Sequence, residues 1–181
     1  MQPDQRVSIV FETHATSLDN EAGLASGWFD VDLSPSGELQ ARAVGERYSA
    51  DEVAAVYCSD LRRAWRTAEL AFEGRALPIV LDIRLRECDY GGLTRRPATE
   101  IDAVRQAYLR TPFPDGESYE QAVRRVTTCL TEIGSAHTGR TVLIIGHRAT
   151  FYAIRHLLEG EPLERVIAAP WRWQPGWHFQ R

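Results

Sequence analysis

Thr141-Val142-Leu143-Ile144-Ile145-Gly146-His147 is the stretch that decides the fold of this chain. Its apolar, mostly β-branched run is typical of a strand buried on both faces, as in a parallel sheet covered by helices. A histidine stands directly after the strand, and a helical pattern then continues to about Leu158, ahead of Gly160. A strand that leads through a short turn into a helix is the repeating unit of an α/β fold.

Working outward, shorter apolar runs predict further strands at Val7–Phe11, Ala54–Cys58 and Pro78–Leu81. Helical patterns lie between these runs, so an α/β sheet covered on both faces is expected. The expected helices begin at the Ser34-Pro35 cap, at Asp60 as N-cap, near Thr99 and at the Ser118-x-x-Gln121 capping box.

Near the C-terminal end, Pro175-Gly176 predicts a turn between two short strands, Trp171–Trp173 and Trp177–Phe179. We interpret the three tryptophans of this segment as terminal packing. The neighbouring arginines Arg124-Arg125, on the long helix after Ser118, are interpreted as part of a solvated face.

Composition excludes several classes of function. The 181 residues suit one domain, and we treat 1–181 as a single domain. All 21 basic residues are arginine, so the lysine that P-loop nucleotide sites, protein kinases and Schiff-base enzymes need is absent. The formal net charge of −4 disfavours binding to nucleic-acid backbones. No leader pattern or bilayer-length apolar run is present, so we expect no membrane partner.

The cysteines give a further indication of compartment. Cys58, Cys88 and Cys129 are widely spaced, and no Cys-x-x-Cys motif occurs, so neither a zinc knuckle nor a thioredoxin-type motif is present. We interpret them as reduced, mostly buried thiols and expect a cytoplasmic protein.

Polar side chains gather where the predicted strands end. In α/β sheets ligands bind beyond the carboxyl ends of strands, and here Thr13-His14, Arg63 and Gly146-His147-Arg148 occupy such places. A neutral imidazole is a nucleophile near pH 7, and a guanidinium matches a phosphoryl group. The combination predicts phosphoryl transfer through a phosphohistidine. A zinc-like site needs three or four ligands, and no His-x-x-x-His occurs, so we expect no metal.

Two carboxylate motifs allow different interpretations. Asp30-Val31-Asp32 is similar to the nucleophile loop of aspartate-dependent phosphatases, but no buried strand precedes it, and we interpret it as loop carboxylates ahead of a helix. Glu87 lies among tyrosine, leucine and glycine residues, where a carboxyl group could serve as general acid.

Taken in order, these motifs resemble the histidine phosphatase superfamily, also called the phosphoglycerate mutase-like fold. Thr13-His14-Ala15-Thr16-Ser17 stands in place of Arg-His-Gly-Glu/Ser-Ser/Thr, and Gly27-Trp28-Phe29-Asp30 leads to Leu33-Ser34 and Gly37 as in the mutase branch. Further matches follow at Ser59–Ala68, at Leu85–Thr94, at Gly116-Glu117-Ser118 and at Gly146-His147. The resemblance runs from residue 9 to about residue 150.

The resemblance implies a three-layer α/β/α sandwich with a mostly parallel sheet and no metal or organic cofactor. It implies that His14 is the phosphorylated nucleophile, that Arg63 and His147 contact the phosphoryl group, and that Glu87 is the proton donor. Asn20, Thr13, Trp28, Tyr90 and Arg148 are the further expected phosphate or substrate contacts.

Two departures from the family pattern matter. The arginine that normally precedes the nucleophile is Thr13, and the glycine that normally follows the second histidine is Arg148. Our hypothesis is that Arg148 supplies the missing positive charge from the neighbouring strand end. The alternative is a member that has lost activity and kept the fold.

The expected function is hydrolysis of a small phosphate monoester by a phosphatase that is a monomer or a homodimer. Two alternatives stay open: a phosphoglycerate mutase-type phosphoryl transferase, and a catalytically silent member that binds a phosphorylated ligand or a partner. The mutase branch carries a lysine after the Tyr90–Thr94 segment, whereas this chain has only Arg95 and Arg96 near that point.

Overall fold

The computed structural model describes residues 6–49 and 51–180, so residues 1–5, at the end where no leader was expected, lie outside it. Within this part of the chain the strands form one sheet in the order β3-β2-β4-β1-β5. Their bounds are β1 (Ser8–Thr13), β2 (Val56–Cys58), β3 (Ile79–Leu81), β4 (Thr141–Gly146) and β5 (Trp177–Gln180). The first four are parallel to their neighbours, and β5 pairs antiparallel with β1. The mostly parallel sheet expected from the sequence is confirmed.

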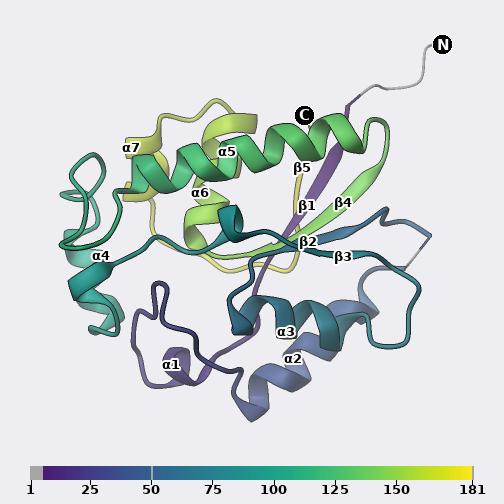
Figure 1. Ribbon diagram of the computed structural model, residues 1–181, viewed down its shortest axis with the longest axis horizontal. Coiled ribbons are helices and arrows are strands. Elements are labelled where there is room, and N and C mark those ends of the chain that lie inside the picture. Colours follow the sequence, from purple (N-terminus) through teal and green to yellow (C-terminus); the bar gives the residue numbers. More distant parts are fainter. Residues whose placement is uncertain (1–5, 50, 181) are drawn as a thin grey trace.

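Helices cover both faces of this sheet (Figure 1). On one side lie α5 (Tyr119–Ala136), α6 (Arg148–Leu158) and α7 (Leu163–Ala168), and on the other side lie α2 (Pro35–Glu46) and α3 (Arg62–Ala71). The short helices α1 (Leu18–Glu21) and α4 (Ala98–Val104) lie at one end of the sheet. Single 3₁₀ turns occupy Ile83–Leu85 and Gly91–Leu93. The three-layer α/β/α arrangement is therefore observed.

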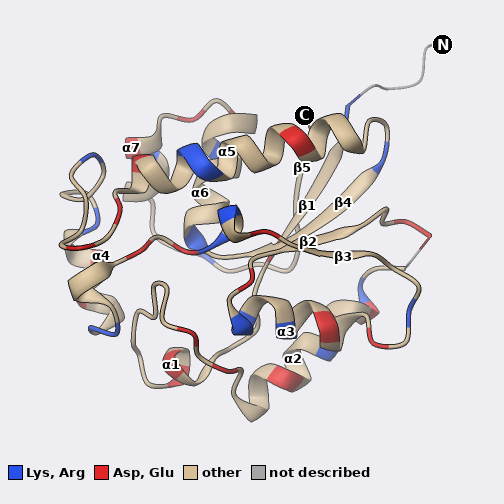
Figure 2. Cartoon of the chain, viewed as in Figure 1, with Lys and Arg blue, Asp and Glu red and all other residues tan. Residues whose placement is uncertain are grey.

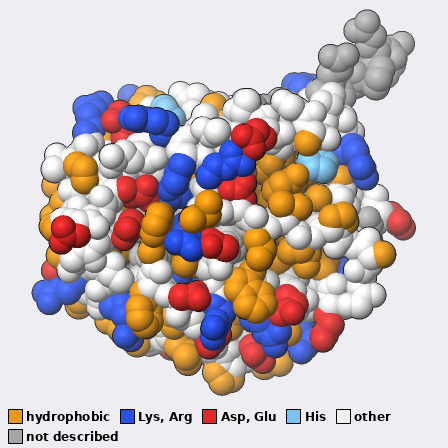
Figure 3. Space-filling model, viewed as in Figure 1, with side chains coloured by type: hydrophobic (Ala, Val, Ile, Leu, Met, Phe, Trp, Pro, Cys, Tyr) orange, Lys and Arg blue, Asp and Glu red, His pale blue; other side chains and the backbone are white. Residues whose placement is uncertain are grey.

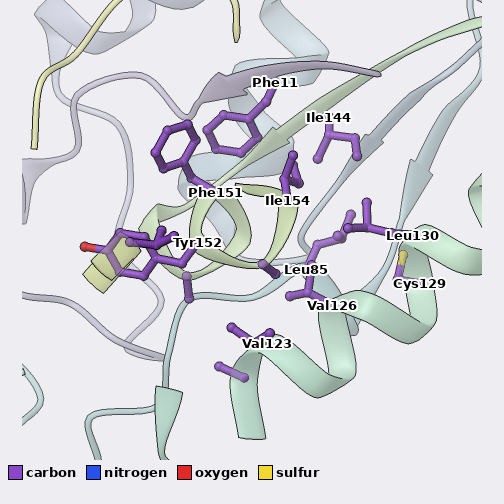
Figure 4. Close-up of a cluster of buried hydrophobic side chains, with 14 of the residues drawn as sticks. Phe11, Leu85, Val123, Val126, Cys129, Leu130, Ile144, Phe151, Tyr152 and Ile154 are labelled. Atoms are coloured by element: carbon purple, nitrogen blue, oxygen red, sulfur yellow. The ribbon is translucent and has the colours of Figure 1, made fainter. Parts of the chain in front are cut away.

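The larger core lies between the sheet and helices α5 and α6 (Figure 4). Phe11 and Ile144 from the strands meet Leu130 of α5 and Ile154 of α6, and all four are fully buried. Burying a side chain of this size contributes about 1.5–3 kcal/mol. The central strands β1 and β4 are thereby held in place, and their ends carry the polar residues of interest.

Capping residues set the start of two helices, as expected. Ser34 Oγ accepts the Gly37 N–H at α2, and Ser118 with Gln121 forms a capping box at α5. The expectation for Asp60 is wrong: Leu61 is the N-cap of α3, and the Asp60 carboxylate binds Arg86 instead, with 2.7 Å between Oδ1 and Nε. Because the Asp60 carboxylate forms an ion pair with the Arg86 guanidinium, it does not cap α3.

The C-terminal segment also differs from the prediction. Of the two short strands, only Trp177–Gln180 forms one, and residues 169–176 cross the end of the sheet as irregular chain. The outer edge of β5 carries no partner strand within the described residues, yet Trp171–Trp173 does not pair with it. Trp171 packs against Phe151 and Trp177 instead, and Trp173 Nε1 donates to Thr13 Oγ1. The helix α7 was not expected from the sequence.

Charges are spread over the helices and loops, and the strands carry few of them (Figure 2). Figure 3 shows basic and acidic side chains side by side on one face, with apolar side chains gathered where the edge strand β3 lies. That apolar group includes Ile79, Val80 and Leu81, which are 38–54% exposed. None of the helices within the described residues is long and apolar enough to span a membrane.

Candidate active site

Two adjacent parallel strands bring the two histidines together. Thr13 of β1 lies opposite Gly146 of β4, and the backbone N–H of His14 donates to the Gly146 carbonyl at 2.9 Å, which extends the pairing by one residue. The rings of His14 and His147 therefore lie with their centroids 5.0 Å apart. The convergence predicted from the strand ends is observed.

The orientation of the His14 ring follows from one hydrogen bond. Its Nδ1 lies 2.7 Å from the carbonyl oxygen of Ala15. Since a carbonyl oxygen can only accept, Nδ1 carries the hydrogen and Nε2 keeps its lone pair. The Ala15 N–H in turn donates to Thr67 Oγ1 at 3.0 Å, which fastens the loop to α3. The Nε2 atom is thus the nucleophilic position of this ring.

Both histidines are held neutral by their surroundings. Burial, followed by the positive charge of Arg63, lowers the pKa of His14 to about 3. Burial also lowers the pKa of His147 well below its ordinary value, with Arg63 and His14 adding to the effect. The Nε2 atom of His147 lies 2.6 Å from Ser59 Oγ, directly after β2, so a buried hydroxyl orients the second ring.

Arg63 brings a buried positive charge to the two rings. It stands in the first turn of α3 and is 2% exposed. Its Nη1 and Nη2 atoms donate to the carbonyl oxygens of Phe29 and Gly27, at 3.1 and 2.8 Å. These neutral acceptors fix the guanidinium without cancelling its charge, which remains available to an anion at the histidines.

Glu87 lies at the N-terminus of α6, beside the second histidine. Its Oε1 accepts the backbone N–H groups of Cys88 (2.8 Å) and Ala149 (3.0 Å), and its Oε2 accepts only that of Arg148 (3.2 Å). The residue is 8% exposed. Oε1 thus has two backbone partners and Oε2 has one.

A cavity of about 640 Å³ opens above His14 and is also lined by Glu87, His147 and Arg148. A smaller hollow of about 100 Å³ adjoins it and is lined by His14, Arg63, Glu87 and Tyr90 among others. His14 and Glu87 therefore face shared space, and the larger volume is in the range of small-molecule sites.

Arg148 borders both hollows, and its guanidinium is tied to the protein on two sides. Its Nε donates to Tyr152 Oη at 3.2 Å and its Nη1 to Asp102 Oδ1 at 2.8 Å. Burial by itself would lower the pKa of Arg148, but Tyr152 and Asp102 raise it above its ordinary value. The side chain is therefore a fixed cation at the rim.

The remaining predicted contacts lie in different places. Asn20 lines both hollows, and its Oδ1 accepts the Ser17 N–H in the cap of α1, so its amide NH₂ group is not used by this cap. Thr13 lines the larger cavity and Tyr90 the smaller one. Trp28 lines neither; its Nε1 donates to the Glu87 carbonyl at 2.7 Å, so it supports the backbone of Glu87.

Sequence reasoning missed residues that support the backbone and the side chains of this site through hydrogen bonds. Arg125, interpreted as solvated, is largely buried and donates to the carbonyl oxygens of Arg84, Arg86 and Glu87 at 2.7–2.8 Å. Ser59, which binds His147, lies at the end of a predicted strand, but the sequence indicated no role for it. An arginine placed at the helix positions that face the core is the one signal that could have identified Arg125. Asp30 Oδ1 accepts the Arg62 N–H at the start of α3, a helix distant in sequence, and not an N–H of α2, the helix that follows it.

The arrangement combines three elements that in-line phosphoryl transfer needs. A neutral imidazole with a free Nε2 can attack phosphorus, a fixed guanidinium can bind the equatorial oxygens, and a carboxyl group can protonate the departing oxygen. Displacement at phosphorus requires mainly positioning and charge stabilisation, and rigid strand ends supply both.

Comparison with known proteins agrees with this chemistry. A model of the histidine phosphatase superfamily (branch 1) matches residues 9–173. Phosphoserine phosphatase 1 of Hydrogenobacter thermophilus is 27% identical over 167 residues, which cover 88% of this chain and 79% of the relative. The 2,3-bisphosphoglycerate-dependent phosphoglycerate mutase of Methylobacterium sp. is 32% identical over 174 residues, covering 87% and 83%.

A solved structure shows the same fold. The native structure of a mycobacterial glucosyl-3-phosphoglycerate phosphatase superposes with a TM-score of 0.79 at 25% identity, covering 90% of this chain and 84% of the other. Because the family model spans most of the chain and the histidines meet at the strand ends as the motifs required, this protein belongs to the histidine phosphatase superfamily.

Proposed function

We propose that the protein is a phosphatase that hydrolyses a small phosphate monoester through a phosphohistidine on Nε2 of His14. The observation that carries the proposal is the 2.7 Å contact from His14 Nδ1 to the Ala15 carbonyl, since it leaves Nε2 unprotonated beside a buried arginine. Phosphatases acting on different monoesters, and a mutase, are similar to this chain, so the ester class is better supported than any single substrate.

In the first step the Nε2 lone pair of His14 forms a bond to phosphorus as the bond from phosphorus to the ester oxygen breaks. The departing alkoxide takes a proton from Glu87 Oε2 and leaves as the alcohol. Arg63, His147 and the Asn20 amide bind the three equatorial oxygens of the transferring group. A neutral nucleophile needs no deprotonation before attack, which the low pKa of His14 provides.

In the second step water attacks the phosphohistidine, and the nitrogen–phosphorus bond breaks. Glu87, now a carboxylate, accepts the proton of that water, and inorganic phosphate leaves. His14 returns to its neutral form and Glu87 to its acid form, so protons balance over the cycle.

Trapping of the intermediate tests the proposal. After mixing with p-nitrophenyl phosphate and an alkaline quench, mass spectrometry should find one phosphate on the peptide containing His14, stable to alkali and labile to acid. The substitution His14→Asn, whose amide can still donate to the Ala15 carbonyl, should abolish both the phosphopeptide and turnover. His156→Asn changes an exposed histidine outside the cavity and is the matched control.

The outcome also separates the alternatives. A phosphoprotein that passes its group to an added alcohol faster than to water would indicate a mutase-type transferase. Binding of phosphate esters with neither trapping nor turnover would indicate a silent member. A chelator should leave the rate unchanged, and strong inhibition by it would contradict the proposed mechanism.

A further inference from the structure

The larger cavity extends well beyond the place where the phosphoryl group reacts. Away from His14 it continues between the C-terminal segment and helix α2, where Trp173, Ala43 and Val44 line it. The residues assigned to the phosphoryl group account for one end only. The other end is therefore available to the alcohol part of a substrate.

Trp173 has an unusual position for a tryptophan. It is 59% exposed, whereas Trp171 packs against Phe151 and Trp177, with centroids 5.2 and 5.6 Å apart. Trp171 and Trp177 thus serve the terminal packing expected from the sequence, and Trp173 does not. Small-molecule pockets are lined mainly by apolar and aromatic side chains, and Trp173 is an exposed aromatic side chain that lines this cavity.

The Trp173 indole is nevertheless fixed in place. Its Nε1 donates to Thr13 Oγ1 at 3.2 Å, and Thr13 directly precedes the nucleophile. The threonine that replaces the family's arginine thus anchors the indole next to the reacting group. An anchored ring loses little conformational entropy when a ligand covers it.

The opposite wall, on α2, combines small apolar side chains with a polar edge. Beyond Ala43 and Val44 lie Gln40 and, from β1, the buried carboxylate of Glu12. Gln40 Oε1 accepts the Thr16 N–H and hydroxyl, which leaves the NH₂ group of Gln40 as the donor for a ligand. Arg47 Nε and Nη2 and the Tyr48 hydroxyl all bind Oε1 of Glu12, so Oε2 is left as an acceptor.

We propose that this end of the cavity binds a flat aromatic ring in the alcohol part of the substrate, stacked on Trp173. The inference rests on the proposed function and names the substrate class of the same site. Trp173 supplies an aromatic face to this end of the cavity, α2 supplies small apolar side chains, and Gln40 and Glu12 supply polar groups for ring heteroatoms. Aliphatic alcohols would leave most of the indole in water.

Two esters with equally poor leaving groups provide the test: 2-phenylethyl phosphate and 2-cyclohexylethyl phosphate. Both release a primary alcohol and have similar size, so their ratio of kcat/KM reports ring shape rather than reactivity. Stacking is expected to favour the phenyl ester about 3–10-fold. Trp173→Ala should bring the ratio close to one, and Trp173→Phe should retain part of the preference.

A matched control is Leu39→Ala, which removes another exposed large side chain, from α2 but outside the cavity lining. Its ratio should equal that of the wild type. Calorimetric titration of both esters into the His14→Asn protein measures the preference in binding, where no turnover interferes.

The outcomes for the two proposals are distinguishable. Equal kcat/KM for the two esters in the wild type, or an equal loss for both in Trp173→Ala, would overturn the aromatic subsite and leave the phosphatase proposal intact. In the second case Trp173 would only support the loop of Thr13. A missing phosphohistidine, with the phenyl ester still bound more tightly, would overturn the phosphatase proposal alone.

Discussion

Arg148 and Asp102 form an ion pair across the mouth of the active site, with 2.8 Å between Nη1 and Oδ1. The pair links the first turn of α6 to helix α4. Asp102 and the Tyr152 hydroxyl accept hydrogen bonds from two of the three guanidinium nitrogens, Nη1 and Nε. The third nitrogen, the buried Nη2, has no hydrogen-bond partner among the described residues. The buried Nη2 is thus an unpaired donor of a fixed cation, although the cation that lowers the pKa of His14 is Arg63.

The hypothesis that Arg148 replaces the arginine missing at position 13 requires that its Nη2 atom reach a phosphoryl oxygen of the bound substrate. A hydrogen bond from a charged donor contributes about 1.5–3 kcal/mol. Arg148→Ala should therefore lower kcat/KM about 10–150-fold. Thr13→Arg should restore part of the loss in that background and add little to the wild type, where the charge is already present.

Steady-state kinetics of the four proteins decides this point, because coupled positions give non-additive effects. Equal gains from Thr13→Arg in both backgrounds would mean that the two positions act independently. Asp102→Asn serves as the companion variant: it keeps Arg148 charged but loosens it, so KM should rise more than kcat falls.

Glu87 offers a second, chemically selective prediction. An alkoxide is a poor leaving group and needs a proton, whereas p-nitrophenoxide does not. Glu87→Gln should lower kcat for an alkyl phosphate by about 10²–10⁴-fold and should affect p-nitrophenyl phosphate far less. The ratio of the two rates is the measurement. A loss of the same size on both esters would show that Glu87 positions the N-terminus of α6 instead.

Much of the fold could be predicted because its signals are local. The buried strand at Thr141–Gly146, the Ser34 cap and the Ser118 capping box depend on residues close together in the sequence, and the structure confirms them. The exceptions depend on contacts distant in sequence. Asp60 binds Arg86 rather than capping α3, and the segment Trp171–Trp173 is held by side-chain contacts of its tryptophans instead of pairing with β5.

The same distinction between local and distant signals applies to the residues of the site. His14 and His147 were predictable because each ends a strand, and parallel strands end at one edge. The residues that support the site could not be predicted. In the sequence Arg125 resembles a surface arginine, and only the fold shows that it donates to three carbonyl groups. Similarly, Trp28 occurs in a family motif, but only the structure shows that it holds the Glu87 backbone.

Gly37 in the first turn of α2 permits a stability prediction. An added Cβ there would lie 1.9 Å from the carbonyl oxygen of Thr16, which also accepts hydrogen bonds from Ser34. Alanine usually stabilises a helix relative to glycine by about 1 kcal/mol. Here we expect the opposite sign, with Gly37→Ala lowering the free energy of unfolding by about 1–3 kcal/mol.

The same substitution should lower kcat, because Thr16 lies two residues from the nucleophile. Gly45→Ala is the matched control: its Cβ would lie 1.8 Å from the Ala71 carbonyl, outside the nucleophile loop. It should cost similar stability in urea unfolding and leave kcat of the folded protein unchanged. A stable, fully active Gly37→Ala protein would contradict the close contact of α2 with the loop.

The lowered pKa of His14 predicts how stability depends on pH. In the unfolded chain the imidazole titrates near 6.5, whereas in the folded protein it stays neutral down to about 3. Between these values the unfolded state binds a proton that the folded state does not, so acid favours unfolding. The folded state is unaffected by this group above pH 6.5 and loses stability as the pH falls toward 3. The slope is at most about 1.4 kcal/mol per pH unit for this histidine.

Urea unfolding at pH 7, 6 and 5 should therefore show that the free energy of unfolding falls less steeply with acid for His14→Asn than for the wild type. Above pH 6.5 the two free-energy curves should run parallel, separated by a constant offset. Parallel losses in the two proteins would mean that His14 titrates alike in the folded and unfolded states, and the neutral buried nucleophile would then be wrong.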